Sequence, residues 1–172
     1  MFPSDKKFQK KTKKKNNRKL LRHSTLYKYA AKWRPTTLHK TVDLPPNQQY
    51  IFPVHPHSTL PTFVSISMMT EGCDWNKLFP GIDRRCLAAS SNFIIPIWRE
   101  VYLWLGYVDA SYKSAMNVLK YKRSLVILPG GEQEMILAKP GENKLILKNR
   151  HGFVRLALER FFRQFASFLH LY

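Results

Sequence analysis

The fold is decided around the stretch Tyr50-Ile51-Phe52-Pro53-Val54-His55-Pro56-His57-Ser58, an apolar run that ends in two histidines on either side of a proline. A short run of apolar and aromatic residues predicts a buried β-strand near residues 49–54. Pro56 fixes its own φ angle and keeps the preceding residue out of the helical region, so the strand ends in a stiff polar corner. Because histidine exchanges protons near neutral pH, His55 and His57 are candidates for a general base. Taken alone, however, the three residues are better explained as an ordinary turn.

The clearest strand in the chain is Ser124-Leu125-Val126-Ile127-Leu128, an apolar run closed by the turn Pro129-Gly130-Gly131. Periodicity and turn signals predict further strands at 93–97 and 144–148, a loop at 78–81, and helices at 60–71, 84–89, 99–105, 111–122 and 152–169. Ser111 is a plausible N-cap for the fourth of these helices. Strands that alternate with helices indicate an α/β layer, and 172 residues suffice for one domain. We divide the chain into a disordered basic arm (1–25), a linker (26–48) and a compact domain (49–172).

The net charge of +18 is unevenly distributed along the chain. Residues 1–40 contain 14 lysines and arginines but a single acid, Asp5, so the charge belongs mainly to the arm. Basic runs bind anionic membranes or nucleic acids, or remain solvated and bind neither. A solvated extension is the first interpretation and membrane attraction the second. Nucleic acid is the least supported partner, because the sequence has no zinc-ligand spacing and no RNA-binding signature.

Metal, secretion and membrane signals are weak. Cys73 and Cys86 are too few and too far apart for a metal cluster, and we predict no metal site. The first twenty residues lack the apolar segment of a signal peptide. The longest stretch without charged residues, 50–70, contains three prolines and two histidines, which argues against a lipid-facing helix. Peripheral membrane contact is therefore favoured over a transmembrane span.

Three further blocks follow the histidine turn in order along the chain. They are Asn92-Phe93-Ile94-Ile95-Pro96-Ile97-Trp98-Arg99-Glu100, Pro129-Gly130-Gly131-Glu132-Gln133-Glu134 and Arg150-His151-Gly152-Phe153-Val154-Arg155-Leu156-Ala157. With the histidine turn, they closely resemble the hallmark motifs of the diacylglycerol O-acyltransferase type 2 family, which includes monoacylglycerol and wax-alcohol acyltransferases. Four motifs in the same order, from about Tyr50 to Leu158, make the resemblance specific.

The resemblance implies an α/β fold of the glycerolipid-acyltransferase type, a mixed sheet with flanking helices. It implies transfer of a fatty acyl group from acyl-CoA to diacylglycerol or a related alcohol, forming triacylglycerol at the endoplasmic reticulum membrane. Acyl-CoA is then a co-substrate, and no other cofactor is expected. Nothing in the sequence predicts an oligomeric state.

The sequence departs from the family pattern at three points. Ser58 replaces the glycine that follows the second histidine, and the N-terminal hydrophobic hairpin of many members is absent. After Leu158, the residues up to Tyr172 match none of the expected continuation. We therefore expect a partial domain, incomplete at its C-terminal side. A truncated and inactive relative, or a basic nucleic-acid-binding protein, is the alternative reading.

Acyl transfer to an alcohol requires a base, a group that stabilises the oxyanion, and substrates held in line. The histidine turn can supply the base, with a slight preference for His57 taken from the resemblance. Related glycerolipid acyltransferases carry an aspartate five residues after the histidine, but Leu60 and Thr62 occupy those positions here. Glu134 is then a candidate to orient the base or to bind the acceptor, and the alternative is a surface glutamate in the first turn of a helix. Gly130 and Gly131 would let backbone N–H groups approach the substrate, although paired glycines also mark ordinary turns.

The remaining candidates are substrate-binding residues. Asn92, Arg99 and Glu100 belong to the second block, where the guanidinium of Arg99 could hold a phosphate of coenzyme A. The alternative is a surface ion pair between Arg99 and Glu100, which would contribute little. Arg150 in the last block could also contact a phosphate, although a solvated basic helix face is the better explanation there.

Overall fold

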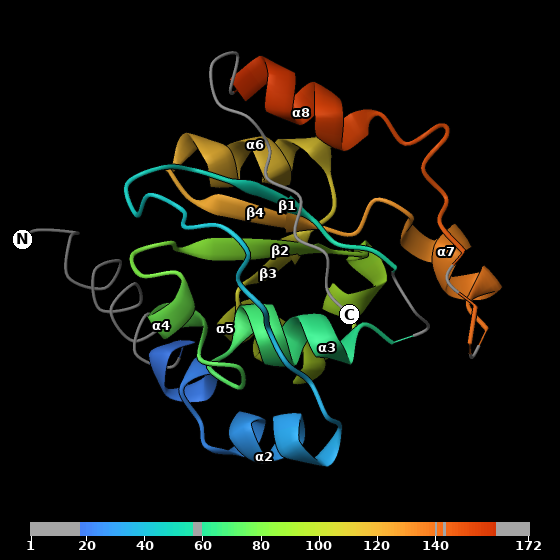
Figure 1. Cartoon of the computed structure of the whole chain (residues 1–172). Coiled ribbons are helices and arrows are strands. Elements are labelled where there is room, and N and C mark those ends of the chain that lie inside the picture. The colour runs from blue at the N-terminus through green and yellow to red at the C-terminus, as the bar shows by residue number, and fades with distance from the viewer. Residues whose placement is uncertain (1–17, 57–59, 140, 143, 161–172) are drawn as a thin grey trace, which may run out of the picture.

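The computed structural model describes residues 18–56, 60–139, 141–142 and 144–160 as a four-stranded parallel sheet with helices on both faces (Figure 1). The strands are β1 (Ile51–Pro53), β2 (Arg84–Ala88), β3 (Tyr107–Asp109) and β4 (Ser124–Ile127), in the spatial order β1-β4-β2-β3. The predicted α/β class with flanking helices is confirmed. The sheet was predicted to be mixed, but every strand pair in the described residues is parallel.

Helices cover both faces of the sheet, as parallel strands require for burial. On one face lie α6 (Tyr112–Lys120) and α8 (Gly152–Arg160) (Figure 1). The opposite face carries α3 (Thr62–Val64) with its π-helical continuation η1 (Ser65–Met69), α4 (Trp75–Leu78) and α5 (Trp98–Leu105), while α2 (Leu26–Trp33) lies below them. Helix α7 (Gly131–Leu137) lies beyond the carboxyl end of β4. Within the described part of the chain, no helix combines the length and apolar composition needed to cross a bilayer.

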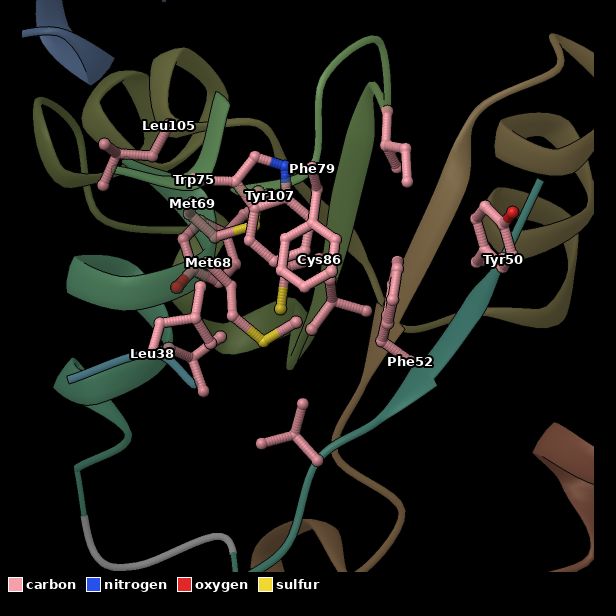
Figure 2. Packing of buried hydrophobic residues seen from close by; sticks show 14 residues of the cluster. Leu38, Tyr50, Phe52, Met68, Met69, Trp75, Phe79, Cys86, Leu105 and Tyr107 are labelled. Carbon is pink, nitrogen blue, oxygen red and sulfur yellow. The ribbon is translucent and has the colours of Figure 1, made fainter. Parts of the chain in front are cut away.

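Alternation along the strands divides the apolar side chains between two cores. Phe52 and Val126 point into the core shared with η1 and α4, whereas Ile51 and Leu125 point into the core shared with α6 and α8. The first core is rich in aromatic and sulfur side chains, among which Trp75 and Phe79 pack 4.6 Å apart between ring centroids (Figure 2). Each face of the sheet is therefore held by its own set of contacts.

Strand β2 corrects the helix predicted at 84–89. The side chain of Arg84 is buried beneath the strand and donates to the carbonyl oxygens of Met68 and Thr70, which end η1. It also pairs with Glu71 at 3.6 Å and stacks over the ring of Trp75 at 4.5 Å. Two consecutive arginines are usually exposed, whereas here they are buried and start a central strand where the sequence had predicted a helix.

Two apolar runs predicted as strands are irregular. Phe93 ends the 3₁₀-helix η2 (Ser90–Phe93), and residues 94–97 form a turn that contains Pro96, whose ring prevents sheet pairing. Residues 144–148 also lack a strand, because 144–147 have no regular secondary structure and residue 148 lies in a turn. Strand β3 was not predicted, because three residues are too short to give a periodic signal.

The remaining predicted strands and helices are confirmed, and the loop predicted at 78–81 begins one residue later, because Leu78 ends α4. The strand at 49–54 is β1, and 124–128 is β4. The helix at 60–71 corresponds to α3 and η1, 99–105 to α5 and 111–122 to α6, whose N-cap Ser111 accepts a hydrogen bond from the Ser114 N–H. The last helix is α8 as far as residue 160, and the rest of that prediction lies outside the described residues.

The N-terminal segment is more ordered than the sequence predicted. Residues 18–22 are helical, and Arg22 is buried, so the basic arm cannot be disordered as far as residue 25. The region interpreted as a linker from 26 contains α2. Residues 1–17, with most of the lysine run, lie outside the described residues.

We expect Phe52→Ala to lower the free energy of unfolding by about 3–5 kcal/mol, because it removes a fully buried ring that packs edge-on against Trp75. Chemical denaturation measures this directly. The exposed Leu26→Ala should stay within about 0.5 kcal/mol of the wild type. Equal effects of the two substitutions would contradict the core described here.

Candidate active site

The histidine turn and the Pro-Gly-Gly turn leave the same edge of the sheet. Strands β1 and β4 are parallel neighbours, and their carboxyl ends meet where the Val54 N–H donates to the Ile127 carbonyl oxygen at 2.8 Å. His55 follows on one strand, and Pro129 and Gly130 follow on the other. The carboxyl edge of an open α/β sheet is the usual place for a ligand site. Two motifs more than 70 residues apart in the chain are thus brought side by side.

The turn itself is described only in part. His55 is half-buried, and its peptide bond to Pro56 is cis. His57 and Ser58 lie outside the described residues, so the preference for His57 as the base stays a prediction.

Glu134 is the buried carboxylate at this edge. It lies on α7 with 2% of its surface exposed, and its Oε2 accepts a hydrogen bond from the Ile146 N–H at 3.1 Å. The sequence predicted Glu134 as a candidate but gave as the alternative an exposed side chain in a first helical turn. The structure overturns that alternative, because the side chain of Glu134 is buried and contacts Gly130 and the backbone N–H of Ile146.

The two glycines are needed for different reasons. A Cβ atom on Gly130 would lie 2.0 Å from Oε2 of Glu134, so only glycine leaves room for that carboxylate. Gly131 has a φ of +55° and open space around its Cα, so it is required by backbone conformation alone. The predicted close approach to the backbone therefore exists, but the group that approaches Gly130 is Glu134 itself.

A cleft of about 650 Å³ opens at the same edge, across the carboxyl ends of β2, β3 and β4. Its floor is apolar, formed by side chains such as Leu87, Ala115 and Ile127, and its rim carries Glu132 and Arg150. The volume and mainly apolar lining fit part of an acyl chain or a small lipid better than a polar metabolite.

The second block lies apart from this cleft. Asn92 is part of η2 and donates through its side-chain amide to the Ala89 carbonyl oxygen at 3.3 Å. Arg99 and Glu100 are at the start of α5 and form an exposed pair with 3.8 Å between the charged atoms. The geometry of Arg99 thus matches the surface-pair alternative, and none of the three is among the described residues that line the cleft.

Arg150 does reach the cleft. It donates to Oε1 of Gln133 on α7 at 2.8 Å, so it links the last block to the Pro-Gly-Gly block. Among the described residues, no group of three or more histidine, cysteine or acidic side chains is placed to hold a metal ion.

Comparison with known proteins identifies the family. The family model for diacylglycerol acyltransferase matches residues 4–163. The chain belongs to the diacylglycerol acyltransferase family. No solved structure matches it.

Three relatives from the diacylglycerol acyltransferase family are 37–38% identical to the chain over the residues that align. Diacylglycerol O-acyltransferase 1 of Schizosaccharomyces pombe is 38% identical over 148 residues, covering 85% of this chain and 43% of the relative. Diacylglycerol O-acyltransferase 2B of Umbelopsis ramanniana is 38% identical over 141 residues, covering 81% and 40%. A Bos taurus diacylglycerol O-acyltransferase 2-like protein 6 is 37% identical over 142 residues, covering 81% and 42%. The chain spans less than half the length of these relatives.

One polar side chain beside the cleft, the carboxylate of Asp109, was not predicted from the sequence. Asp109, the last residue of β3, accepts hydrogen bonds from the Ser90 hydroxyl and from the Ser111 N–H. The side-chain hydrogen bonds from Ser90 and Ser111 lower the pKa of the Asp109 carboxyl. Ser90 and Ser111 both line the cleft. An acid at the end of a strand just before an N-cap serine was the available signal, but the strand was too short to be recognised.

The two glycines can be separated by a double-mutant cycle with Glu134→Ala. We expect Gly130→Ala to destabilise the protein by about 1–3 kcal/mol through overpacking. In the Glu134→Ala background, the same substitution should destabilise the protein by about 1 kcal/mol less, or by a still smaller amount. Gly131→Ala should cost about 1–2 kcal/mol from backbone strain, independently of Glu134. Urea denaturation of the single and double variants gives both coupling energies. Equal coupling at the two positions would show that the carboxylate does not rest against Gly130.

Proposed function

We propose that this chain is an acyl-CoA-dependent O-acyltransferase that transfers a fatty acyl group to diacylglycerol and forms triacylglycerol. The observation that carries the proposal is the position of the histidine turn beside the Pro-Gly-Gly turn and Glu134, at the carboxyl edge of the parallel sheet. Membership of the family and the names of its relatives support the same activity.

In the proposed reaction, a histidine of the turn accepts the proton of the acceptor hydroxyl as its oxygen attacks the thioester carbonyl carbon. The attack forms the new C–O bond and a tetrahedral oxyanion. When this intermediate collapses, the C–S bond breaks, and the leaving thiolate takes up the proton that the histidine holds. One base can serve both transfers, and such general-base catalysis contributes about 10²–10⁴-fold in rate.

Glu134 has the properties of a positioning residue for that base. Its carboxylate is fixed by the Ile146 N–H and by close contact with Gly130, in the turn that leaves the same edge of the sheet as the histidine turn. A buried carboxylate can select the tautomer of a neighbouring imidazole and stabilise the cation that forms during proton transfer. This would replace the aspartate that is missing at the positions of Leu60 and Thr62.

The apolar cleft is the proposed place for the acyl chain or for part of the acceptor. Its mainly apolar floor would exclude water from the thioester, while Arg150 on the rim is placed to meet a polar end of a substrate. Asn92, Arg99 and Glu100 remain proposed substrate contacts from the family motif, although in the described structure they lie outside this cleft.

The decisive experiment uses microsomes from a yeast strain without its own neutral-lipid acyltransferases, expressing this chain and supplied with labelled acyl-CoA and diacylglycerol. We expect labelled triacylglycerol from the wild type and a loss of about 10²–10⁴-fold in His55→Ala/His57→Ala, because the base is removed. His39→Ala, at an exposed histidine outside the site, is the matched control and should retain activity.

Two results would contradict the proposal. Full activity in the double-histidine variant would remove the proposed base. No product from well-expressed wild type, with any of diacylglycerol, monoacylglycerol or a long-chain alcohol, would indicate an inactive relative.

We further propose that the carboxyl edge of the sheet faces a membrane, in the endoplasmic reticulum by family resemblance. Three segments that follow strands at this edge carry exposed apolar side chains: Leu60 after β1, Ile94, Ile95 and Ile97 after β2, and Ile136, Leu137, Leu145 and Leu147 after β4. Apolar side chains gathered around a site in this way are typical of a lipid or protein contact. A bilayer is the occupant that fits a cleft for acyl chains, because the substrates are dissolved in it.

Substitution of the turn after η2 tests the membrane contact. We expect Ile94→Asp/Ile95→Asp to reduce binding to phosphatidylcholine vesicles by about tenfold or more, since two apolar side chains would no longer leave water. Vesicle flotation measures the bound fraction. Leu26→Asp/Val42→Asp, at two exposed apolar positions on other segments, provides the control and should bind as the wild type does. Equal losses in the two variants would contradict a contact through this edge.

A further inference from the structure

A second large cleft lies at the opposite, amino edge of the sheet. Its volume is about 740 Å³, and it is bordered by the residues that begin β2 and precede β4, together with the helical turn at 18–22. Six of its described lining residues are cations, Arg18, Lys19, Arg22, Arg84, Arg85 and Arg123, against the two carboxylates of Glu71 and Asp83. The cleft therefore holds a local excess of four positive charges, and it shares no lining residue with the cleft of the candidate active site.

The carboxylates are already shared among several arginines. Glu71 pairs with Arg84, whose guanidinium also donates to the carbonyl oxygens of Met68 and Thr70 at the end of η1. Asp83 forms salt bridges with three other arginines, with nitrogen–oxygen distances of 2.6 Å to Arg85, 3.0 Å to Arg123 and 4.0 Å to Arg22. A single carboxylate cannot neutralise three guanidinium groups, so the cluster retains uncompensated charge.

The arginines are fixed in position by the fold. Arg22 donates through Nε to the Leu105 carbonyl oxygen at 2.8 Å and contacts the Arg84 carbonyl oxygen, and a Cβ on Gly106 would lie 1.9 Å from its Nη2. Arg85 donates to the carbonyl oxygen of Arg84 at 2.6 Å. Such anchoring removes the entropy that flexible arginines would lose on binding a ligand.

Arg18 has an unused donor. Its Nε is buried, yet it has no hydrogen-bond partner among the described residues. Burial, with a further contribution from the charge of Arg85, lowers the pKa of Arg18 to about 10, and burial with the charges of Arg84 and Arg85 lowers that of Arg22 to about 9. Both cations are destabilised as they stand, and an anion placed between them would relieve that cost.

We propose that the arginine cluster at the amino edge, formed by Arg18, Arg22, Arg85 and Arg123, is a binding site for a phosphate-ester anion. Guanidinium groups pair with phosphate oxygens through two parallel N–H donors, and a dianionic phosphate offers enough acceptors for several arginines at once. The phosphate could belong to a soluble ester or to the head group of an anionic phospholipid, and these share the same chemistry. Because the cluster lies across the sheet from His55 and Glu134, the site is separate from the proposed catalytic one.

Calorimetric titration of the full chain with inorganic pyrophosphate tests the site. We expect binding to the wild type and a loss of about tenfold for each arginine removed, hence about 100-fold in Arg18→Gln/Arg123→Gln. Lys32→Gln/Lys113→Gln removes the same charge from exposed lysines that line neither cleft, and it should bind pyrophosphate within about threefold of the wild type. Arg123→Lys keeps the charge and loses the planar fork, so it should bind about tenfold more weakly even if the double variant fails to fold.

Vesicle binding distinguishes the two sources of phosphate. Retention by phosphatidylcholine vesicles that contain phosphatidic acid, released by pyrophosphate and lost in Arg18→Gln/Arg123→Gln, would identify a lipid head group. Pyrophosphate binding without such retention would identify a soluble ester. The proposal is overturned if the wild type binds neither, if both double variants lose affinity equally, or if Arg123→Lys binds as the wild type does. Pyrophosphate should still bind His55→Ala/His57→Ala, so failure of the acyltransferase proposal would leave this result unchanged.

Discussion

The pairing of β1 with β4 is the contact on which the rest of the structure depends. The Tyr50 N–H donates to the Ser124 hydroxyl, 74 residues away in sequence, and the Leu125 N–H donates to the Tyr50 carbonyl oxygen at 2.8 Å. This pairing places β4 between β1 and β2, where Val126 is fully buried. Without it the histidine turn and the Pro-Gly-Gly turn would leave the sheet at unrelated positions. A central parallel strand therefore both completes the core and assembles the candidate active site.

Because all four strands are parallel, the two edges of the sheet differ in chemistry. The carboxyl edge gathers the histidine turn, the buried Glu134 and an apolar cleft, while the amino edge gathers arginines that precede or begin β2 and β4. In an antiparallel sheet, each edge would receive the starts and ends of alternate strands, and these groups would be mixed. This separation allows one small sheet to carry a site for apolar substrates at one end of its strands and a strongly basic site at the other end.

Sequence reasoning succeeded where local signals agreed with the fold. Strand β4 was predictable because an apolar run ends at Pro129 and two glycines, and α6 because Ser111 caps an amphipathic segment. It failed at β2, because Arg84 and Arg85 are buried only through partners that lie far away in sequence, such as Glu71 and the end of η1. The burial of Glu134 could likewise not be predicted from nearby residues, since it depends on the space that Gly130 leaves and on a hydrogen bond from the Ile146 N–H, 12 residues further along the chain. Tertiary contacts, and not propensity, decided these positions.

The apolar turn at 94–97 shows why exposure was harder to predict than apolarity. The three isoleucines of the run that predicted a strand are exposed. The turn is nevertheless held by aromatic contacts: Phe93 and Trp98 both pack against Tyr102, which in turn packs on the buried Tyr107 at 4.7 Å. Ile97 has a φ of +68°, a conformation that is strained for a β-branched residue. A loose loop would relax this strain and fold its isoleucines inward. The aromatic contacts hold both ends of the turn, and Ile94 and Ile95 are exposed between them, as expected for a surface that is covered in use.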